Sequence, residues 1–238
     1  LPADEWQAIS LNYTSGTTGN PKGVVYHHRG AHLNAVNNAL SWELPKHPVY
    51  LWTLPMFHCN GWCFPWTLAA TAGVSVCLRH VQAAAIYGAL REHKVSHFCA
   101  APIVLNMLNN ADPALKQGLD HPVKAMTAGA APPATVIAGM EAMGIAVTHV
   151  YGLTKTYGPC VVCEPQRRWQ GQDATTLSRL KARQGVASPL QGEMRVINPV
   201  SGEPVPMDGK TLGEIVLRGN IVMKGYLKNP SASEEAMA

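Results

Sequence analysis

The chain has 238 residues, of which 47% are hydrophobic and 14% are charged, so it carries enough apolar material for a core and lacks the composition of a disordered protein. Its formal net charge is +4 and its basic residues are scattered, which argues against nucleic-acid binding. No apolar run reaches the length that a membrane-spanning helix needs.

Over residues 1–165, short apolar runs alternate with amphipathic stretches, a pattern that predicts strands alternating with helices. Strands are expected at 9–13, 49–54, 74–78, 95–100, 123–128 and 145–150. Helices are expected at 62–72, 81–93, 103–110 and 132–143. This alternation implies an α/β fold, with a mostly parallel sheet and flanking helices.

The pattern changes beyond residue 165, where a polar helix-like stretch at 170–183 leads into turn-rich sequence. Short strands are expected there at 193–197 and 213–218. We therefore expect an α/β core at 1–165, followed at 166–238 by a truncated, antiparallel β subdomain of the same large domain.

Both ends suggest a piece of a longer chain. The first residue is Leu1 rather than Met, and a strand-like run begins almost at once. The acidic, polar start does not have the character of a secretory leader. The chain stops within a Ser/Ala/Glu-rich stretch at 231–238, where we do not expect a natural domain end.

The six cysteines favour a reducing compartment, and hence a cytoplasmic protein. Cys160-Val-Val-Cys163 has the spacing of half a zinc site or of a redox pair, but no second such pair follows. The two valines favour a buried strand. No zinc spacing is complete among the histidines, so no metal site is expected from these residues.

The segment Tyr13-Thr-Ser-Gly-Thr-Thr-Gly-Asn-Pro-Lys-Gly23 follows the first expected strand. Its glycines allow close backbone approach to a ligand, and its hydroxyls, amides and lysine suit phosphate oxygens. It is not a Walker A loop, because Pro21 stands where the second glycine belongs. Gly-Thr-Thr-Gly alone would fit an ordinary turn, but all eleven residues favour a phosphate loop. The residues expected to hold phosphate are Thr14, Ser15, Gly16, Thr17, Thr18, Gly19 and Lys22.

With this loop and five further segments in order, the chain resembles the adenylate-forming (ANL) superfamily of acyl-CoA synthetases, luciferases and peptide-synthetase adenylation domains. The further segments are Pro55-Met-Phe-His58, Thr127-Ala-Gly-Ala-Ala-Pro132, Tyr151-Gly-Leu-Thr154, Gly213-Glu-Ile-Val-Leu-Arg-Gly219 and Gly225-Tyr226. Within the superfamily, His58-Cys-Asn-Gly-Trp62 and Ala182-Arg-Gln-Gly-Val186 are most similar to medium-chain and methylmercaptopropionate CoA ligases.

The resemblance implies a role for each segment. Adenine would lie against Gly129, Ala130, Ala131, Pro132, Tyr151 and Gly152, where small residues leave room and a tyrosine offers a flat face. Lys22, Thr154 and His58 are the expected catalytic residues, with Thr154 at the α-phosphate. His58, Trp62 and Gly129 would line the acyl site, and the first two would share one wall if the segment were helical. A satisfied core histidine is the alternative for His58.

The resemblance also implies two half-reactions. A carboxylate attacks the α-phosphorus of ATP to give acyl-AMP and pyrophosphate, and CoA then displaces AMP to give the thioester. The implied cofactors are ATP/AMP, Mg²⁺ and CoA, and the implied partners are a carboxylic acid and CoA, with a homodimer as a further expectation. Catalysis in the first step is mainly positioning and charge neutralisation.

Lys155 departs from the family pattern, because it stands where the resemblance implies a glutamate that helps to hold Mg²⁺. An ammonium group cannot ligate a cation. Three interpretations stay open: a poor or inactive adenylating enzyme, a residue introduced to disable one, and a natural member with altered metal use.

Other parts that the resemblance implies are absent from this chain. They are the start of the large domain, a ribose-binding aspartate, and a small C-terminal domain with a catalytic lysine. Because closure of the two domains completes such a site, we expect the isolated chain to be inactive and to bind nucleotide weakly. Two alternatives remain: a non-catalytic nucleotide-binding pseudoenzyme, and an adenylating enzyme that loads a carrier protein.

Overall fold

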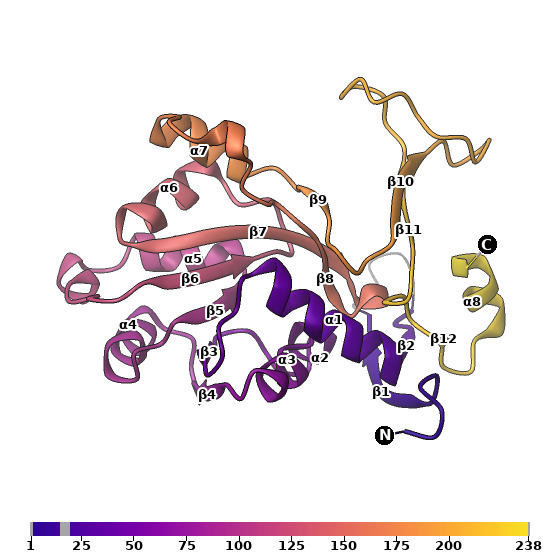
Figure 1. Ribbon diagram of the computed structural model, residues 1–238, viewed down its shortest axis with the longest axis horizontal. Coiled ribbons are helices and arrows are strands. Elements are labelled where there is room, and N and C mark those ends of the chain that lie inside the picture. Colours follow the sequence, from indigo (N-terminus) through magenta and orange to yellow (C-terminus); the bar gives the residue numbers. More distant parts are fainter. Residues whose placement is uncertain (1, 15–19, 238) are drawn as a thin grey trace.

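The structure, a computed structural model, describes residues 2–14 and 20–237, and the strands within those residues form three sheets (Figure 1). The largest has seven strands in the order β4-β3-β5-β6-β7-β8-β9. Their bounds are β3 Val49–Trp52, β4 Val74–Cys77, β5 His97–Ala100, β6 Val123–Thr127, β7 Ile145–Leu153, β8 Gly158–Val162 and β9 Val186–Ala187. The pairs from β4 to β7 are parallel, whereas β7–β8 and β8–β9 are antiparallel.

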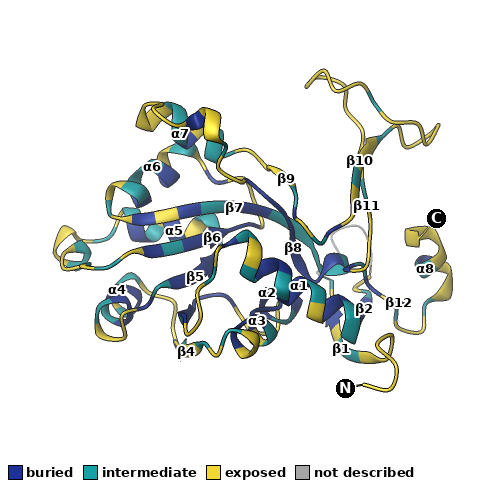
Figure 2. Ribbon diagram, viewed as in Figure 1, coloured by how far each residue is buried: buried dark blue, intermediate teal, exposed yellow. Residues whose placement is uncertain are grey.

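One face of this sheet is covered by α4 (Ala83–Glu92), α5 (Pro102–Asn109) and α6 (Ala134–Ala142). Their apolar stripes pack on alternate strand residues, such as Leu51, Phe98 and Ala125. Figure 2 shows these strands as largely buried. The stripe of α4 follows the helical spacing from which that helix was predicted, whereas α6 was predicted from the two prolines at its start.

The other face packs against α1 (His28–Ser41), α2 (Cys59–Trp62) and α3 (Phe64–Ala70). Here the core is aromatic, with Tyr50, Trp52 and Phe64 buried. The apolar pattern does not predict α1, because its buried side consists of small residues and asparagines. These residues are Gly30, Ala31, Asn34, Ala35, Asn37 and Asn38.

A second sheet consists of β1 (Ala8–Tyr13), β2 (Gly23–His27) and β12 (Gly225–Tyr226), all antiparallel. The third is the pair β10 (Glu193–Ile197) and β11 (Glu214–Arg218), which stands away from the large sheet in Figure 1. The remaining elements are α7 (Ala174–Lys181), α8 (Pro230–Met237) and the 3-10 turns η1 (Pro113–Lys116), η2 (Thr154–Thr156) and η3 (Arg167–Trp169).

The predicted fold class, a mostly parallel sheet with flanking helices followed by an antiparallel β pair, is confirmed. The strands β9 and β12 come from beyond residue 165 yet complete sheets whose other strands precede it. Because these sheets cross the predicted boundary, the structure does not separate two parts there. The division into 1–165 and 166–238 stays a prediction. No helix among the described residues has both the length and the apolar character needed to cross a membrane.

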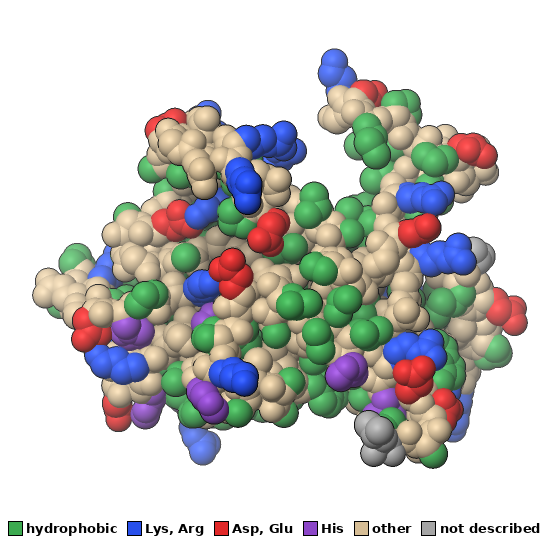
Figure 3. All heavy atoms as spheres, viewed as in Figure 1, with side chains coloured by type: hydrophobic (Ala, Val, Ile, Leu, Met, Phe, Trp, Pro, Cys, Tyr) green, Lys and Arg blue, Asp and Glu red, His purple; other side chains and the backbone are tan. Residues whose placement is uncertain are grey.

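Two local expectations change. The helix expected at 62–72 begins at Phe64, because the preceding residues are left-handed. The strand expected around Cys160-Val-Val-Cys163 is confirmed as β8, and all six cysteines are free thiols. Charged side chains of both signs are interspersed over the face seen in Figure 3.

Candidate nucleotide and acyl site

The base of the predicted phosphate loop is closed by Thr14 and Lys22. The Thr14 amide donates to the Lys22 carbonyl (3.0 Å), and the Lys22 amide donates to Thr14 Oγ1 (3.1 Å). The five residues Ser15, Gly16, Thr17, Thr18 and Gly19 lie outside the described residues, so their phosphate contacts stay predictions.

Lys22 carries its charge beside the last strand of the small sheet. Its Nζ lies 5.3 Å from the ring centroid of Tyr226, within range of a cation–π interaction. Tyr226 belongs to Gly225-Tyr226, a segment about two hundred positions further along the chain that the resemblance also singled out. This pairing keeps the ammonium group at the base of the loop.

Thr154 begins the η2 turn at the end of β7, and two distant parts of the chain bond to it. Tyr26 OH on β2 donates to the Thr154 carbonyl (2.7 Å). The Cys59 thiol donates to Thr154 Oγ1 across 3.6 Å. Burial raises the pKa of Cys59, so the thiol keeps the proton that it donates. Just beyond the turn, Tyr157 stacks on Tyr26 with ring centroids 3.8 Å apart.

Gly152 is fixed by close approach to the next strand. A Cβ at this position would lie 1.8 Å from the carbonyl oxygen of Gly158. The glycine of Tyr151-Gly-Leu-Thr154 therefore lets β7 fold against β8 and turn into η2. Packing alone accounts for a glycine at position 152. The contact of Gly152 with nucleotide stays a prediction.

Lys155 follows Thr154 in the same turn and is half-buried. The Met223 amide donates to its backbone carbonyl (2.7 Å), so backbone bonding on both sides holds the turn in place. Within residues 2–14 and 20–237, no group of three His, Cys, Asp or Glu side chains is arranged to hold a metal ion. A turn that presents an ammonium group does not fit Mg²⁺.

The predicted adenine segment leaves the sheet where β6 ends. Gly129 has φ +89° and, with Ala130 and Ala131, is exposed, whereas Pro132 is buried. Because Thr127 pairs with His149 in parallel register, Gly129 leaves the sheet beside Tyr151. Tyr151 is half-buried, and burial raises its pKa. The two segments predicted to contact adenine are thus neighbours at the carboxyl edge of the sheet, which is where open α/β sheets bind ligands.

The predicted acyl-wall residues are placed differently from each other. The helical premise is wrong: residues from Cys59 to Cys63 all have positive φ. Trp62 is 5% exposed and packs in the aromatic core, whereas the His58 side chain is exposed. A spacing of four along a right-handed helix therefore does not place these two side chains on one wall. Their acyl-site roles stay predictions.

Asparagines that the sequence motifs did not include hold this left-handed turn. Asn38 Nδ2 on α1 donates to the Trp62 carbonyl (2.8 Å), and Asn60 bonds to residues of β1. The Asn60-Gly61 dipeptide was an available signal, since both residue types favour left-handed backbone.

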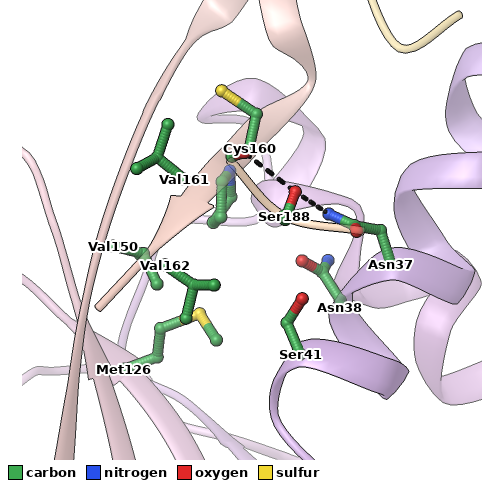
Figure 4. Close-up of a pocket in the computed structure, with 10 residues that line it drawn as sticks. Asn37, Asn38, Ser41, Met126, Val150, Cys160, Val161, Val162 and Ser188 are labelled. Carbon is green, nitrogen blue, oxygen red and sulfur yellow. Dashed lines mark hydrogen bonds between the residues drawn. The ribbon is translucent and has the colours of Figure 1, made fainter. Parts of the chain in front are cut away.

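Two cavities among the described residues are lined by none of the side chains predicted to bind nucleotide or acid. A small pocket of about 10 Å³, enough for about one water molecule, lies between α1 and β8 (Figure 4). Asn37 Nδ2 donates to Ser188 Oγ (2.7 Å), which in turn donates to the Cys160 carbonyl (2.8 Å). A second, open groove of about 390 Å³ lies between α5 and α6, with Asn106, Lys116 and Gly139 among its lining residues.

Comparison with known proteins extends over almost the whole chain. The family model for AMP-binding enzymes matches residues 1–227. The chain is 55% identical over 240 residues to an acetate/butyrate–CoA ligase of Arabidopsis thaliana, and 51% identical over 238 residues to an acetate–CoA ligase of Humulus lupulus. Each alignment covers all of this chain but only 42% of the relative.

Solved structures agree on the fold. The N-terminal domain of FACL13 from Mycobacterium tuberculosis, in an inhibitor-bound crystal structure, matches with a TM-score of 0.80 and 26% identity, covering 99% of this chain and 56% of that one. ATP-bound MatB from Rhodopseudomonas palustris matches with a TM-score of 0.83 and 23% identity, covering 99% and 44%. The chain belongs to the AMP-binding enzyme family.

Proposed function

We propose that the protein containing this chain is an acid–thiol ligase that activates a carboxylic acid with ATP and transfers the acyl group to CoA. The observation that carries the proposal is the identity of about half of all residues, over the full length of this chain, to proteins named as CoA ligases. The adenylating part of the reaction is the part to which this chain contributes.

In the first step, a carboxylate oxygen bonds to the α-phosphorus of ATP while the bond to pyrophosphate breaks. Lys22 would neutralise charge on the leaving pyrophosphate, since its ammonium group is held at the base of the loop. Thr154 would donate to an α-phosphate oxygen from a turn fixed by Tyr26 and Cys59. Adenine would lie between Tyr151 and the segment that begins at Gly129.

The fold family implies Mg²⁺, but the residues present at the Thr154 turn do not fit it, and no step is derived through the metal. The Lys155 ammonium group carries a positive charge to this turn. The local electrostatics would then come from lysines rather than from a divalent ion held by a carboxylate.

For the substrate, we infer a short or medium apolar acid. The names of three relatives specify acetate, butyrate or 2-methylpropanoate. In this chain, Trp62, which belongs to the turn that follows His58, and Trp52 are both part of one buried apolar cluster. A preference for long-chain acids in competition among acids of increasing length would contradict this inference.

The test is ATP–pyrophosphate exchange with a panel of short and medium acids, using the complete protein with Lys155 and with Lys155→Glu. Exchange only in the glutamate form would mean that Lys155 disables adenylation. Exchange in both would mean that the site works without that carboxylate. Exchange in neither would remove the ligase proposal for this protein.

One alternative is favoured by Lys155 itself: a non-catalytic nucleotide-binding pseudoenzyme. It predicts AMP binding by calorimetry without exchange in the native protein. Loading of a carrier protein is a second alternative, separated by assaying acyl transfer to CoA and to a carrier in parallel.

Cellular location, assembly and the activity of the fragment remain proposals. The free thiols support the cytoplasm, whereas the name of the Arabidopsis relative includes the word peroxisomal. Fluorescence microscopy of the tagged complete protein would distinguish the two. Sedimentation would test for a homodimer, and exchange by the 238-residue chain alone, which we expect to be absent, would test whether this fragment suffices.

A further inference from the structure

Five consecutive residues, from Cys59 to Cys63, have left-handed backbone. Their φ values are 47°, 40°, 57°, 55° and 64°. Only Gly61 lacks a Cβ. Left-handed conformation is unfavourable for other L-residues and normally occurs at single positions. A run of this length persists only where its surroundings over-determine it, and such segments cluster at functional sites.

Asn60 is the point at which this turn is held to β1. Its backbone amide donates to Asn12 Oδ1 (2.9 Å), and its Oδ1 accepts from Asn12 Nδ2 (2.7 Å). The same Oδ1 accepts from Ser10 Oγ (2.6 Å). Asn12 is 4% exposed, so this paired amide contact is shielded from water. Two parallel bonds fix orientation as well as distance.

The contacts on either side of Asn60 lead to different parts of the predicted site. Asn12 is the next-to-last residue of β1, two positions before Thr14, which closes the base of the phosphate loop. On the other side, Cys59 donates to Thr154 Oγ1 (3.6 Å). His58 and Trp62 flank the turn. The left-handed turn therefore touches the strand before the phosphate loop, the α-phosphate threonine and the expected acyl wall.

We propose that Asn60 is a positioning residue that holds β1 and the Thr154 turn in register, so that nucleotide and acid meet in reactive geometry. The inference rests on the proposed adenylating function. In such a reaction, a displacement of about 1 Å between the two substrates can lower the rate about 100-fold. Asn60 acts through Asn12 and Cys59 and touches no reacting atom.

Asn60→Gly isolates the side chain, because glycine accepts the left-handed backbone but loses the acceptor oxygen. We expect kcat of ATP–pyrophosphate exchange to fall about 10- to 100-fold. The KM values for ATP and for the acid should each change less than about 3-fold, since each substrate keeps its own contacts. Asn12→Ala should have a similar effect, and the double variant should lose less than the two single losses combined, because both changes remove the bond from Asn12 Nδ2 to Asn60 Oδ1.

His47→Gly is the matched control. His47 is also left-handed (φ 58°) and exposed, but lies on the loop before β3. It should leave kcat unchanged. Ser10→Ala removes only one of the three bonds and should lower kcat about 3-fold, which keeps the test available if Asn60→Gly folds poorly.

Amide hydrogen exchange supplies a readout independent of catalysis. Asn60→Gly should speed exchange both at Thr14 and at Tyr157, whose amide donates to the Thr154 carbonyl (3.3 Å), whereas His47→Gly should change neither. Unchanged protection at both positions, unchanged kcat, or additive losses in the double variant would overturn the inference. The kcat and KM values are measured in whichever form of the protein, with Lys155 or with Lys155→Glu, catalyses ATP–pyrophosphate exchange. Absence of ATP–pyrophosphate exchange in both forms would refute the ligase function. Amide hydrogen exchange would still decide the role of Asn60.

Discussion

The two faces of the seven-stranded sheet are built by different chemistry. On the face covered by α4, α5 and α6, the core is built largely from buried aliphatic side chains such as Leu90, Leu105 and Ile137. On the face covered by α1 to α3, buried asparagines, aromatic rings and a left-handed turn meet. The predicted site residues His58, Trp62 and Thr154 are attached to the second face. The first face therefore mainly contributes apolar packing. The second face buries asparagines whose hydrogen bonds hold the turn next to the predicted site residues.

Gly152→Ala should have the largest effect on the site-bearing region. The added Cβ would lie 1.8 Å from a backbone oxygen, which cannot rotate away, so either β7 or β8 must shift. We expect a loss of about 3 kcal/mol or more in the free energy of unfolding, together with loss of nucleotide binding. Urea unfolding and calorimetric titration with AMP measure both. Retention of wild-type stability would mean that β7 and β8 can separate freely here.

Lowering the pH should destabilise the α1–α3 face through His97. Burial, and secondarily the Lys124 ammonium group, lower the pKa of His97 to about 4. The unfolded chain, with a pKa near 6.5, takes up a proton first, so stability is complete above about pH 6.5 and falls until about pH 4, by a total on the order of 3 kcal/mol. Urea unfolding from pH 7 to 4 should show a shallower decline in His97→Gln. Equal slopes in the two proteins would contradict this assignment.

Asn38→Ala should lower the free energy of unfolding more than a similar substitution at an exposed helix end. Asn38 is 1% exposed, and its amide satisfies the Trp62 carbonyl, which would be left unpaired. We expect a loss of about 2 kcal/mol. Asn110→Ala at the end of α5, where the exposed amide bonds to Asn106 one turn back, should change the free energy of unfolding by less than about 0.5 kcal/mol. Similar losses in both variants would remove the contrast between the faces.

Gly88→Ala should be the smallest effect and of opposite sign. Gly88 lies inside α4, and no atom lies within 4 Å of its would-be Cβ. Alanine should raise stability by about 0.5–1 kcal/mol through helix propensity, with exchange kinetics unchanged. Thermal unfolding measures the gain. A loss of stability would contradict the prediction, because it would mean that a methyl group at position 88 meets atoms of the protein.

On the first face, α4 and α5 were predictable because their apolar residues follow the helix period, and the strands because they are short apolar runs, whereas α6 was predicted from the two prolines at its start. The helices at α4, α5 and α6 and the strands β3 to β7 lie close to their expected bounds. By contrast, α1 has asparagines where an amphipathic helix has aliphatic residues, so its buried side carries no apolar signal. The left-handed turn at Cys59–Cys63 was not predicted, and it shortens the helix expected at 62–72, because hydrophobic spacing carries no information on handedness.

The sequence by itself determined the α/β class, the alternation of elements, and the motif segments that link this chain to the AMP-binding enzyme family. These depend on local residue order. Only the tertiary structure decided that Asn60 bonds to Asn12, that Tyr26 holds the Thr154 turn, and that Tyr226 lies beside Lys22. Such contacts join residues distant along the chain, and the close packing of strands rather than any local pattern brings them together.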